Sequence, residues 1–344
     1  MSPSADVQEP VSTDPTILAL RKTLCSEDSQ LALRFRSLFS LKHLATHSND
    51  AASAQAAIDA IAAGFASPSA LLKHELAYCL GQTGKPAAEP YLKNVLEDLN
   101  EDPMCRHEAA EALGALGNAS SLEVLRRFRD RPGEEVVVTE TCEIAIDRIE
   151  WENSEERKQE KLKQRQVALG LFQSDFVSVD PAPPMPEQDR SVEELGKTLM
   201  DTSLPLFLRY RAMFALRDLA SPPDLPTAVP AILALARGLT EDKSALFRHE
   251  IAFVFGQLSH PASIPALTES LSNLEEASMV RHEAAEALGG LGDEAGVEDT
   301  LKKFLNDKEK VVRESCIVAL DMAEYEKSGE TEYALIPDVT SAAA

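Results

Sequence analysis

Four of the seven histidines in this 344-residue chain are followed directly by a glutamate. The four pairs are His74-Glu75, His107-Glu108, His249-Glu250 and His282-Glu283. The first two pairs are 33 residues apart, and so are the last two. Imidazole and carboxylate groups together are the ligands of non-haem iron, manganese and zinc sites, so the pairs indicate a metal centre.

The chain also matches itself at an offset of 175 residues, which indicates a tandem duplication. Residues 33–36 (LRFR) return at 208–211 as LRYR, and residues 106–114 (RHEAAEALG) return unchanged at 281–289. The two sets of His-Glu pairs are therefore copies of one another, and each half of the chain carries one set.

Each half contains a finer repeat of roughly 33 to 39 residues, with units that begin at Leu33, Leu72, Cys105 and Val138 in the first half. An apolar-periodic helix, a turn with glycine or proline and a second helix make up each unit, as in HEAT-like helical hairpins. No stretch alternates polar and apolar residues for long enough to indicate a sheet. The sequence predicts an all-α fold of HEAT-like helical-hairpin repeats, with two pseudo-symmetric halves of about four hairpins each, joined by a linker.

A change in composition marks the linker between the halves. A charged run from Trp151 to Lys163 is expected to prolong a helix, whereas four prolines between residues 181 and 186 exclude one. The predicted divisions are a flexible N-terminal tail (1–16), an N-terminal half (17–155), the linker (156–190), a C-terminal half (191–326) and a flexible C-terminal tail (327–344).

The repeat explains how the His-Glu pairs can meet. Equivalent positions in successive repeats lie on neighbouring helices about 8 to 10 Å apart, so His74 and His107 should project from one face. A metal ion with bonds of about 2 Å to each imidazole can bridge that separation. The same holds for His249 and His282. Two halves that face each other about a pseudo-twofold axis would combine both sets in one dinuclear cleft.

A simpler interpretation is that His-Glu is a consensus pair on the helix surface. The first and fourth hairpins of each half argue against it, because they carry other residues at the aligned positions. Those residues are Phe35-Arg36, Tyr210-Arg211, Thr139-Glu140 and Arg313-Glu314. The zinc-protease motif H-E-x-x-H is absent, since Tyr78 and Glu111 stand at its second histidine.

Two further glutamates and two glutamines recur at the duplication offset. Glu111 and Glu286 follow the second histidine of each half by one helical turn, and a ligand role and a helix-surface role both stay open for them. Gln82 and Gln257 each follow a glycine and are interpreted as helix C-caps without a chemical role.

The composition restricts the partners and the compartment. A net charge of -23 repels nucleic acid and anionic membranes and favours a cationic partner, although it can also serve solubility alone. Five cysteines without a C-x-x-C motif indicate reduced thiols. With neither an apolar leader nor an apolar run of about 18 residues, the protein is expected to be a cytoplasmic monomer, with room for a nuclear pool.

A duplicated helical-hairpin chain with two K/R-H-E segments in each half resembles the deoxyhypusine hydroxylases, also called deoxyhypusine monooxygenases. The resemblance extends over about residues 17–325. It implies two Fe(II) ions per chain, O2 as co-substrate and an external reductant. It also implies that the chain completes hypusine by hydroxylating the deoxyhypusine side chain of a translation initiation factor. By the same resemblance the iron ligands are His74, Glu75, His107, Glu108, His249, Glu250, His282 and Glu283.

The four carboxylates need not share one role. If each metal takes two histidines and the carboxylate of the second pair, Glu108 or Glu283, then Glu75 and Glu250 are free to bind the substrate amines. Ligation of metal by all four carboxylates is the open alternative. A different class of function is a non-catalytic HEAT-like scaffold or a bilin-lyase-like repeat protein that binds a basic partner. Metal content distinguishes these classes.

Overall fold

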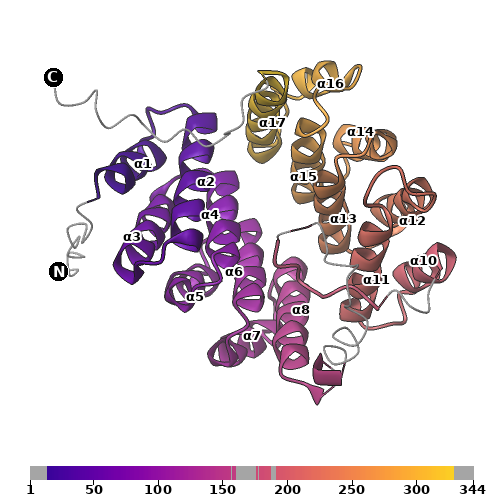
Figure 1. Cartoon of the computed structure of the whole chain (residues 1–344), viewed down its shortest axis with the longest axis horizontal. Helices are drawn as coiled ribbons and strands as arrows, with labels where there is room; N and C mark the ends of the chain where they lie inside the picture. Colours follow the sequence, from indigo (N-terminus) through magenta and orange to yellow (C-terminus); the bar gives the residue numbers. More distant parts are fainter. Residues whose placement is uncertain (1–13, 156, 160–175, 177, 187–190, 329–344) are drawn as a thin grey trace.

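The structure is a computed structural model that describes residues 14–155, 157–159, 176, 178–186 and 191–328 (Figure 1). Every regular element in these ranges is helical, which confirms the predicted all-α class. No helix among these residues is long and apolar enough to cross a bilayer.

Each half has four inner helices, which line the middle of the molecule, and four outer helices (Figure 1). The inner helices are α2 (Leu31–His47), α4 (Ala70–Gln82), α6 (Pro103–Leu116), α8 (Val136–Glu152), α11 (Leu206–Leu219), α13 (Ala245–Leu258), α15 (Ser278–Gly289) and α17 (Lys310–Ser328). The outer helices are α1 (Pro15–Cys25), α3 (Ala51–Ala62), α5 (Glu89–Glu97), α7 (Leu122–Arg129), α10 (Val192–Met200), α12 (Ala228–Glu241), α14 (Ile264–Ser272) and α16 (Val297–Lys303). Short 3-10 turns lie at η1 (Ala63–Ala66), η2 (Pro86–Ala88), η3 (Ala119–Ser121) and η5 (Pro261–Ser263). This is the predicted pair of four-hairpin halves.

The helix bounds differ slightly from the expected divisions. Helix α1 begins at Pro15, inside the expected N-terminal tail, because the carboxylate of Asp14 caps it by accepting the N–H of Thr16 at 2.8 Å. Helix α17 continues to Ser328, two residues beyond the expected C-terminal half. The expected tails otherwise fall on residues 1–13 and 329–344, outside the described residues. The charged run prolongs α8 only to Glu152, because the helix is capped at Asn153 and a turn follows before residues 155 and 157–159 are helical again.

Adjacent inner helices approach closely where one helix has glycine and the next has alanine. A Cβ atom on Gly81 would lie 2.8 Å from the Cα of Ala112, and one on Gly114 would lie 2.9 Å from the Cα of Ala145. Since real Cβ atoms do not approach so closely, these glycines allow neighbouring inner helices to pack tightly. The interpretation of Gly81 and Gln82 as a C-cap is wrong. Both residues lie inside α4, and Thr83 is the capping residue.

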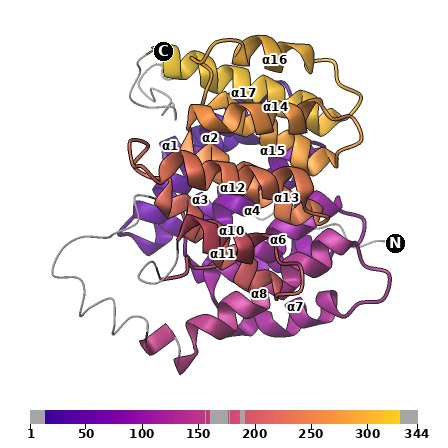
Figure 2. The same ribbon diagram turned by 90° about the vertical axis from the view of Figure 1, so that its right-hand side faces the viewer.

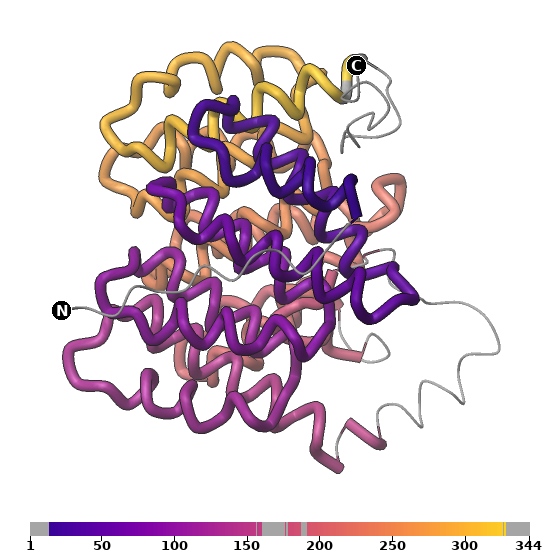
Figure 3. Tube along the Cα trace, turned by 90° about the vertical axis from the view of Figure 1, so that its left-hand side faces the viewer, coloured from indigo at the N-terminus to yellow at the C-terminus, as the bar shows by residue number. Residues whose placement is uncertain are grey.

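The two halves close on each other at two seams, one between α17 and helices α2 and α4, and one between α8 and helices α11 and α13. Ser69 donates a hydrogen bond to Glu314 across the first seam at 2.8 Å, and Ser244 donates to Glu140 across the second at 2.7 Å. The inner helices thus form a closed ring (Figure 1). Figure 2 views the ring from the C-terminal half and Figure 3 views it from the N-terminal half.

We expect the ion pair between Arg36 on α2 and Asp321 on α17 to couple the two halves energetically. The guanidinium donates two hydrogen bonds to the carboxylate, at 2.7 and 3.0 Å, in a mostly buried seam. A double-mutant cycle with Arg36→Met and Asp321→Asn, read by urea unfolding, should give a coupling energy of about 1 kcal/mol or more. The exposed pair Arg126–Glu150 within one half is the control, and a cycle on it should give less. Equal coupling in both cycles would contradict the role of the seam.

Candidate metal centre

A cation precedes each His-Glu pair and ties its helix to the loop that follows the next outer helix. The four ion pairs are Lys73–Glu101 at 2.5 Å, Arg106–Glu134 at 2.7 Å, Arg248–Glu276 at 2.6 Å and Arg281–Asp307 at 2.6 Å. Successive residues on a helix point about 100° apart, so a cation that is held by its own hairpin turns the following histidine toward the middle of the ring. We call these four ion pairs the outer ladder.

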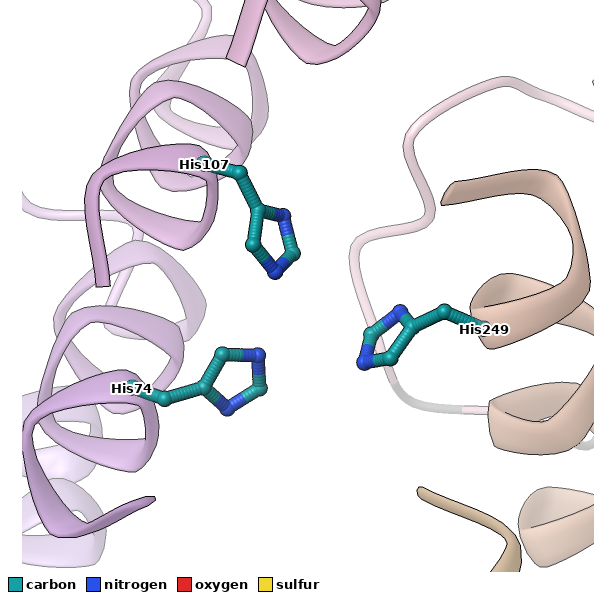
Figure 4. Close-up of side chains that lie close together, drawn as sticks. All are labelled: His74, His107 and His249. Atoms are coloured by element: carbon teal, nitrogen blue, oxygen red, sulfur yellow. The ribbon is translucent and has the colours of Figure 1, made fainter. Parts of the chain in front are cut away.

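The four histidines converge from both halves, and Figure 4 shows three of them. His74 and His107 project from neighbouring helices of the N-terminal half toward His249 on the opposite side of the ring. The ring centroids of His74 and His107 are 5.3 Å apart, as are those of His249 and His282. Between the halves, His107 lies 5.4 Å from His249, and His74 lies 5.2 Å from His282. All four side chains are buried.

Within each half the first histidine lies against the carboxylate of the second pair. His74 Nε2 is 3.3 Å from Glu108 Oε2, and His249 Nε2 is 3.4 Å from Glu283 Oε2. His249, Glu283 and His282 have ligand atoms within 4.8 Å of one another, as one metal ion requires. The carboxylate of the first pair lies differently, because Glu75 approaches only His74 Nδ1, at 3.8 Å. The C-terminal half thus combines two histidines and one glutamate at metal-ligand spacing. The groups of this kind that involve the N-terminal half are His107 with Glu108 and Glu111, and His74 and His107 with His249 of the other half.

The cluster contains many buried polar atoms without hydrogen bonds. Both ring nitrogens of His74, His107 and His249, the Nε2 atom of His282 and one oxygen of Glu250 have no hydrogen-bond partner among the described residues. The approach of Glu108 to His74 does not have hydrogen-bond geometry. Each unpaired buried polar group costs about 1 to 3 kcal/mol, so this cluster is expensive unless a metal ion satisfies it. The donor set of imidazoles and carboxylates fits metal ions bound among these residues.

Burial controls the protonation of the cluster. It lowers the pKa of His249 to about 3 and holds the pKa values of His107 and His282 well below the usual range. Burial also raises the pKa of Glu283 to about 8, and the nearby Glu75 and Glu108 add to the shift. Burial alone would lower the pKa of His74, but the carboxylates of Glu108 and Glu75 raise this pKa well above its usual value. A divalent cation binds neutral imidazoles and ionised carboxylates, so its binding here would release the protons that His74 and Glu283 hold at neutral pH.

Glu111 and Glu286 lie beside the cluster and not on the outer surface. Glu111 joins His107 and Glu108 in a group with ligand atoms within 4.8 Å of one another. Glu286 lies 3.4 Å from His282 Nδ1 and accepts a hydrogen bond from the hydroxyl of Ser315 at 3.0 Å. A carboxylate on the distal nitrogen of a ligand histidine fixes the orientation of the ring. The geometry gives Glu286 the position for that task.

Sequence reasoning missed two pairs of residues at this site. Tyr78 and Phe253 follow the first histidine of each half by one turn, and their rings meet edge to face across the halves at 5.8 Å. Gln82 and Gln257 follow by two turns, and both bind residues 178–179 of the linker. The available signal was their recurrence at the duplication offset, on the same helix face as the histidines.

The other histidines lie away from the cluster. The rings of His43 and His47 stack on each other at 4.3 Å on α2. His260 accepts the N–H of Ala262 at the start of η5.

Comparisons with known proteins agree with this architecture. A model of HEAT repeats matches residues 58–143 and 229–321. The chain is similar to the deoxyhypusine hydroxylase of Neurospora crassa, with 76% identity over 95% of this chain and 99% of that protein. It is 71% identical to the deoxyhypusine hydroxylase of Gibberella zeae over the full length of both. Among solved structures, human deoxyhypusine hydroxylase in complex with glycerol is 43% identical, with a TM-score of 0.76 over 90% of this chain and 96% of that one.

We expect Glu134→Gln to destabilise the fold in a pH-dependent way. Hydrogen bonds from Arg106 lower the pKa of Glu134 to about 2, below the value of about 4.3 in an unfolded chain. The ion pair therefore stabilises the fold above the unfolded value, and this contribution disappears as the pH falls toward 2. The variant should lose about 3 kcal/mol at neutral pH, because it leaves the buried Arg106 uncompensated, and the difference from wild type should shrink in acid.

Urea unfolding at pH values from about 7 to about 3 measures this difference. Glu123→Gln, at an exposed position on α7, is the control and should change the free energy of unfolding little at any pH. A deficit in Glu134→Gln that stays constant down to the lowest pH would contradict the assignment.

Proposed function

This chain belongs to the deoxyhypusine hydroxylase family, and we propose that it hydroxylates deoxyhypusine with two iron ions, one held in each half. The family assigns the hydroxylation step of hypusine synthesis and a monooxygenase activity. The identity and number of the metal ions, the roles of the individual carboxylates and the protein that carries the substrate are our proposals.

One observation carries the two-iron proposal. In each half the first histidine lies against the second glutamate, at matching separations of 3.3 and 3.4 Å, and in the C-terminal half His282 completes a group at metal-ligand spacing. Two imidazoles and one carboxylate per metal leave coordination positions open, as in iron(II) centres that react with O2. The two sets are adjacent, since imidazoles of opposite halves lie within 5.2 to 5.7 Å.

When bound, the iron ions would activate O2, so that one oxygen atom enters a substrate C–H bond and the other leaves as water, with two electrons from an external reductant and two protons. The chain itself positions the substrate and excludes water. The rings of Tyr78 and Phe253 close the space between the halves one turn from the histidines. Buried walls of this kind keep bulk water away from the reacting C–H bond.

The remaining carboxylates support recognition of a cationic side chain. The deoxyhypusine side chain carries amines that are protonated at neutral pH. Glu75 and Glu250 lie next to the first histidine of each half, outside the close His-Glu contacts, and can accept hydrogen bonds from these amines. We propose as substrate a deoxyhypusine-bearing translation initiation factor, acted on by a monomeric, cytoplasmic enzyme. The net charge of -23 favours approach of that cationic side chain.

The division of the carboxylates predicts two classes of variant. Glu108→Gln and Glu283→Gln should each lower the iron content, because each removes a charged ligand from one half. Glu75→Gln and Glu250→Gln should keep most of the iron and bind substrate roughly 10- to 100-fold more weakly, since a hydrogen bond to a charged group contributes about 1.5 to 3 kcal/mol. Elemental analysis and substrate affinity on the four variants are the measurements. Equal loss of iron in all four would show that every carboxylate is a ligand.

Salt should weaken substrate association if the negative charge serves recognition. Raising the ionic strength from about 0.1 M to about 1 M shortens the Debye length from about 10 Å to about 3 Å, which screens attraction beyond the contact distance. We expect the KM for the substrate protein to rise across this series while kcat changes less. A KM that stays constant would mean that the charge serves solubility alone.

A further inference from the structure

The linker crosses the middle of the ring and is held by a residue pair that the duplication repeats. Gln82 on α4 and Gln257 on α13 are equivalent positions, 175 residues apart. The side chain of Gln82 accepts the N–H of Val179 at 2.8 Å and donates to its carbonyl at 3.3 Å. Gln257 donates to the hydroxyl of Ser178 at 2.7 Å. We call residues 178–186 the strap, and Figure 1 shows it between α6 and α13.

The strap is anchored on the C-terminal half. Asp180 pairs with the buried Arg217 on α11 at 2.8 Å, and Arg211 on α11 donates to the carbonyl of Pro183 at 3.1 Å. The N–H of Met185 donates to the carbonyl of Arg211 at 3.0 Å, and the Met185 side chain is buried. The strap is therefore a packed part of the structure along the seam between α8 and α11.

The other seam has no such segment among the described residues. Arg36 is the duplicate of Arg211, but it binds Asp321 on α17 directly. Lys42 is the duplicate of Arg217, and it lies partly exposed near the ring of Tyr78, with the ammonium 5.8 Å from the ring centroid. The duplication alone would make the two seams alike, so the strap breaks the pseudo-twofold symmetry of the ring.

The two carboxylates assigned to the substrate also differ, because one is more exposed to solvent than the other. Glu250 lies within electrostatic reach of Asp180 in the strap and of Arg217. It is 1% exposed and has a buried oxygen without a hydrogen-bond partner among the described residues. Its duplicate Glu75 is 8% exposed, with 11% of its side chain accessible. A carboxylate that must receive a cation from outside needs access to solvent, and Glu75 is the more accessible of the two.

We propose that the strap seals the approach to Glu250, so that the substrate side chain enters from the more accessible side, past Glu75. The cation then passes Glu75 first and reaches Glu250 at the closed end. The inference rests on the proposed function for the identity of the cation that enters, whereas the one-sided access is a property of the fold. Gln82 and Gln257 act as positioning residues, because they hold the strap across the ring.

A cationic thiol reagent tests the access directly. Glu75→Cys and Glu250→Cys, each in the iron-loaded full chain, are treated anaerobically with 2-aminoethyl methanethiosulfonate, and the modification rate at the new thiol is read by peptide mass spectrometry. The thiol at position 75 should react at least about tenfold faster than that at position 250, since the latter reacts only when the strap opens. Equal rates would overturn the inference.

Releasing the strap provides the second comparison. Val179→Pro removes the N–H that Gln82 accepts without changing a helix, and Gln82→Ala removes both bonds from the other side. Either change should raise the rate at position 250 several-fold and leave the rate at position 75 unchanged. Gln55→Ala, which removes an exposed glutamine of α3 that donates a hydrogen bond to Asp59, is the control and should change neither rate. A modification rate at position 250 that neither strap variant changes would overturn the inference.

Iron content and hydroxylation of the substrate protein by the wild-type chain, measured alongside, separate the two proposals. A chain that holds no iron or leaves deoxyhypusine unmodified would refute the proposed function, whatever the labelling rates. An active, iron-loaded chain with equal rates at both positions would refute the entrance alone.

Discussion

Closure of the helical ring forces four imidazoles and their neighbouring carboxylates into one buried space, and the rest of the molecule is organised around that constraint. Seven ring nitrogens there lack hydrogen bonds among the described residues. Buried polar groups without partners are unfavourable in an ordinary protein core. The arrangement is understandable when metal ions supply the missing bonds. The fold must then hold the cluster together before a metal arrives, against the repulsion of crowded carboxyl groups.

The four ion pairs of the outer ladder help to hold the cluster together. Arg106 and Arg281 each donate to a carboxylate and also to the carbonyl that lies ten residues earlier in the chain, at Leu96 and Leu271. The cation therefore joins an inner helix to the outer helix that precedes it and to the loop after the outer helix that follows it. Because the histidine is the next residue, the same contacts that stabilise the hairpin orient the ligand. One short segment, K/R-H-E, therefore serves both stability and function. Its cation points toward the outer hairpin contacts, and its histidine points toward the metal cluster.

Much of this arrangement could be predicted from the sequence, because it depends on periodicity. The 33-residue and 175-residue offsets alone predict that His74, His107 and their duplicates share the inside of two helical halves. Periodicity cannot predict contacts that form between the halves. The edge-to-face contact of Tyr78 and Phe253 and the path of the strap depend on how α4 faces α13, which no local pattern encodes. Gln82 was misread for the same reason, since a glycine before it suggests a cap until Ala112 is seen to pack there.

The central claim is that the ring holds two metal ions, one for each half. Anomalous diffraction at the iron absorption edge, on crystals of the iron-loaded full chain, tests it most directly. The account predicts two peaks, one nearest His74, His107 and Glu108 and the other nearest His249, His282 and Glu283. A single peak midway between the four imidazoles, or peaks that lie away from them, would contradict it.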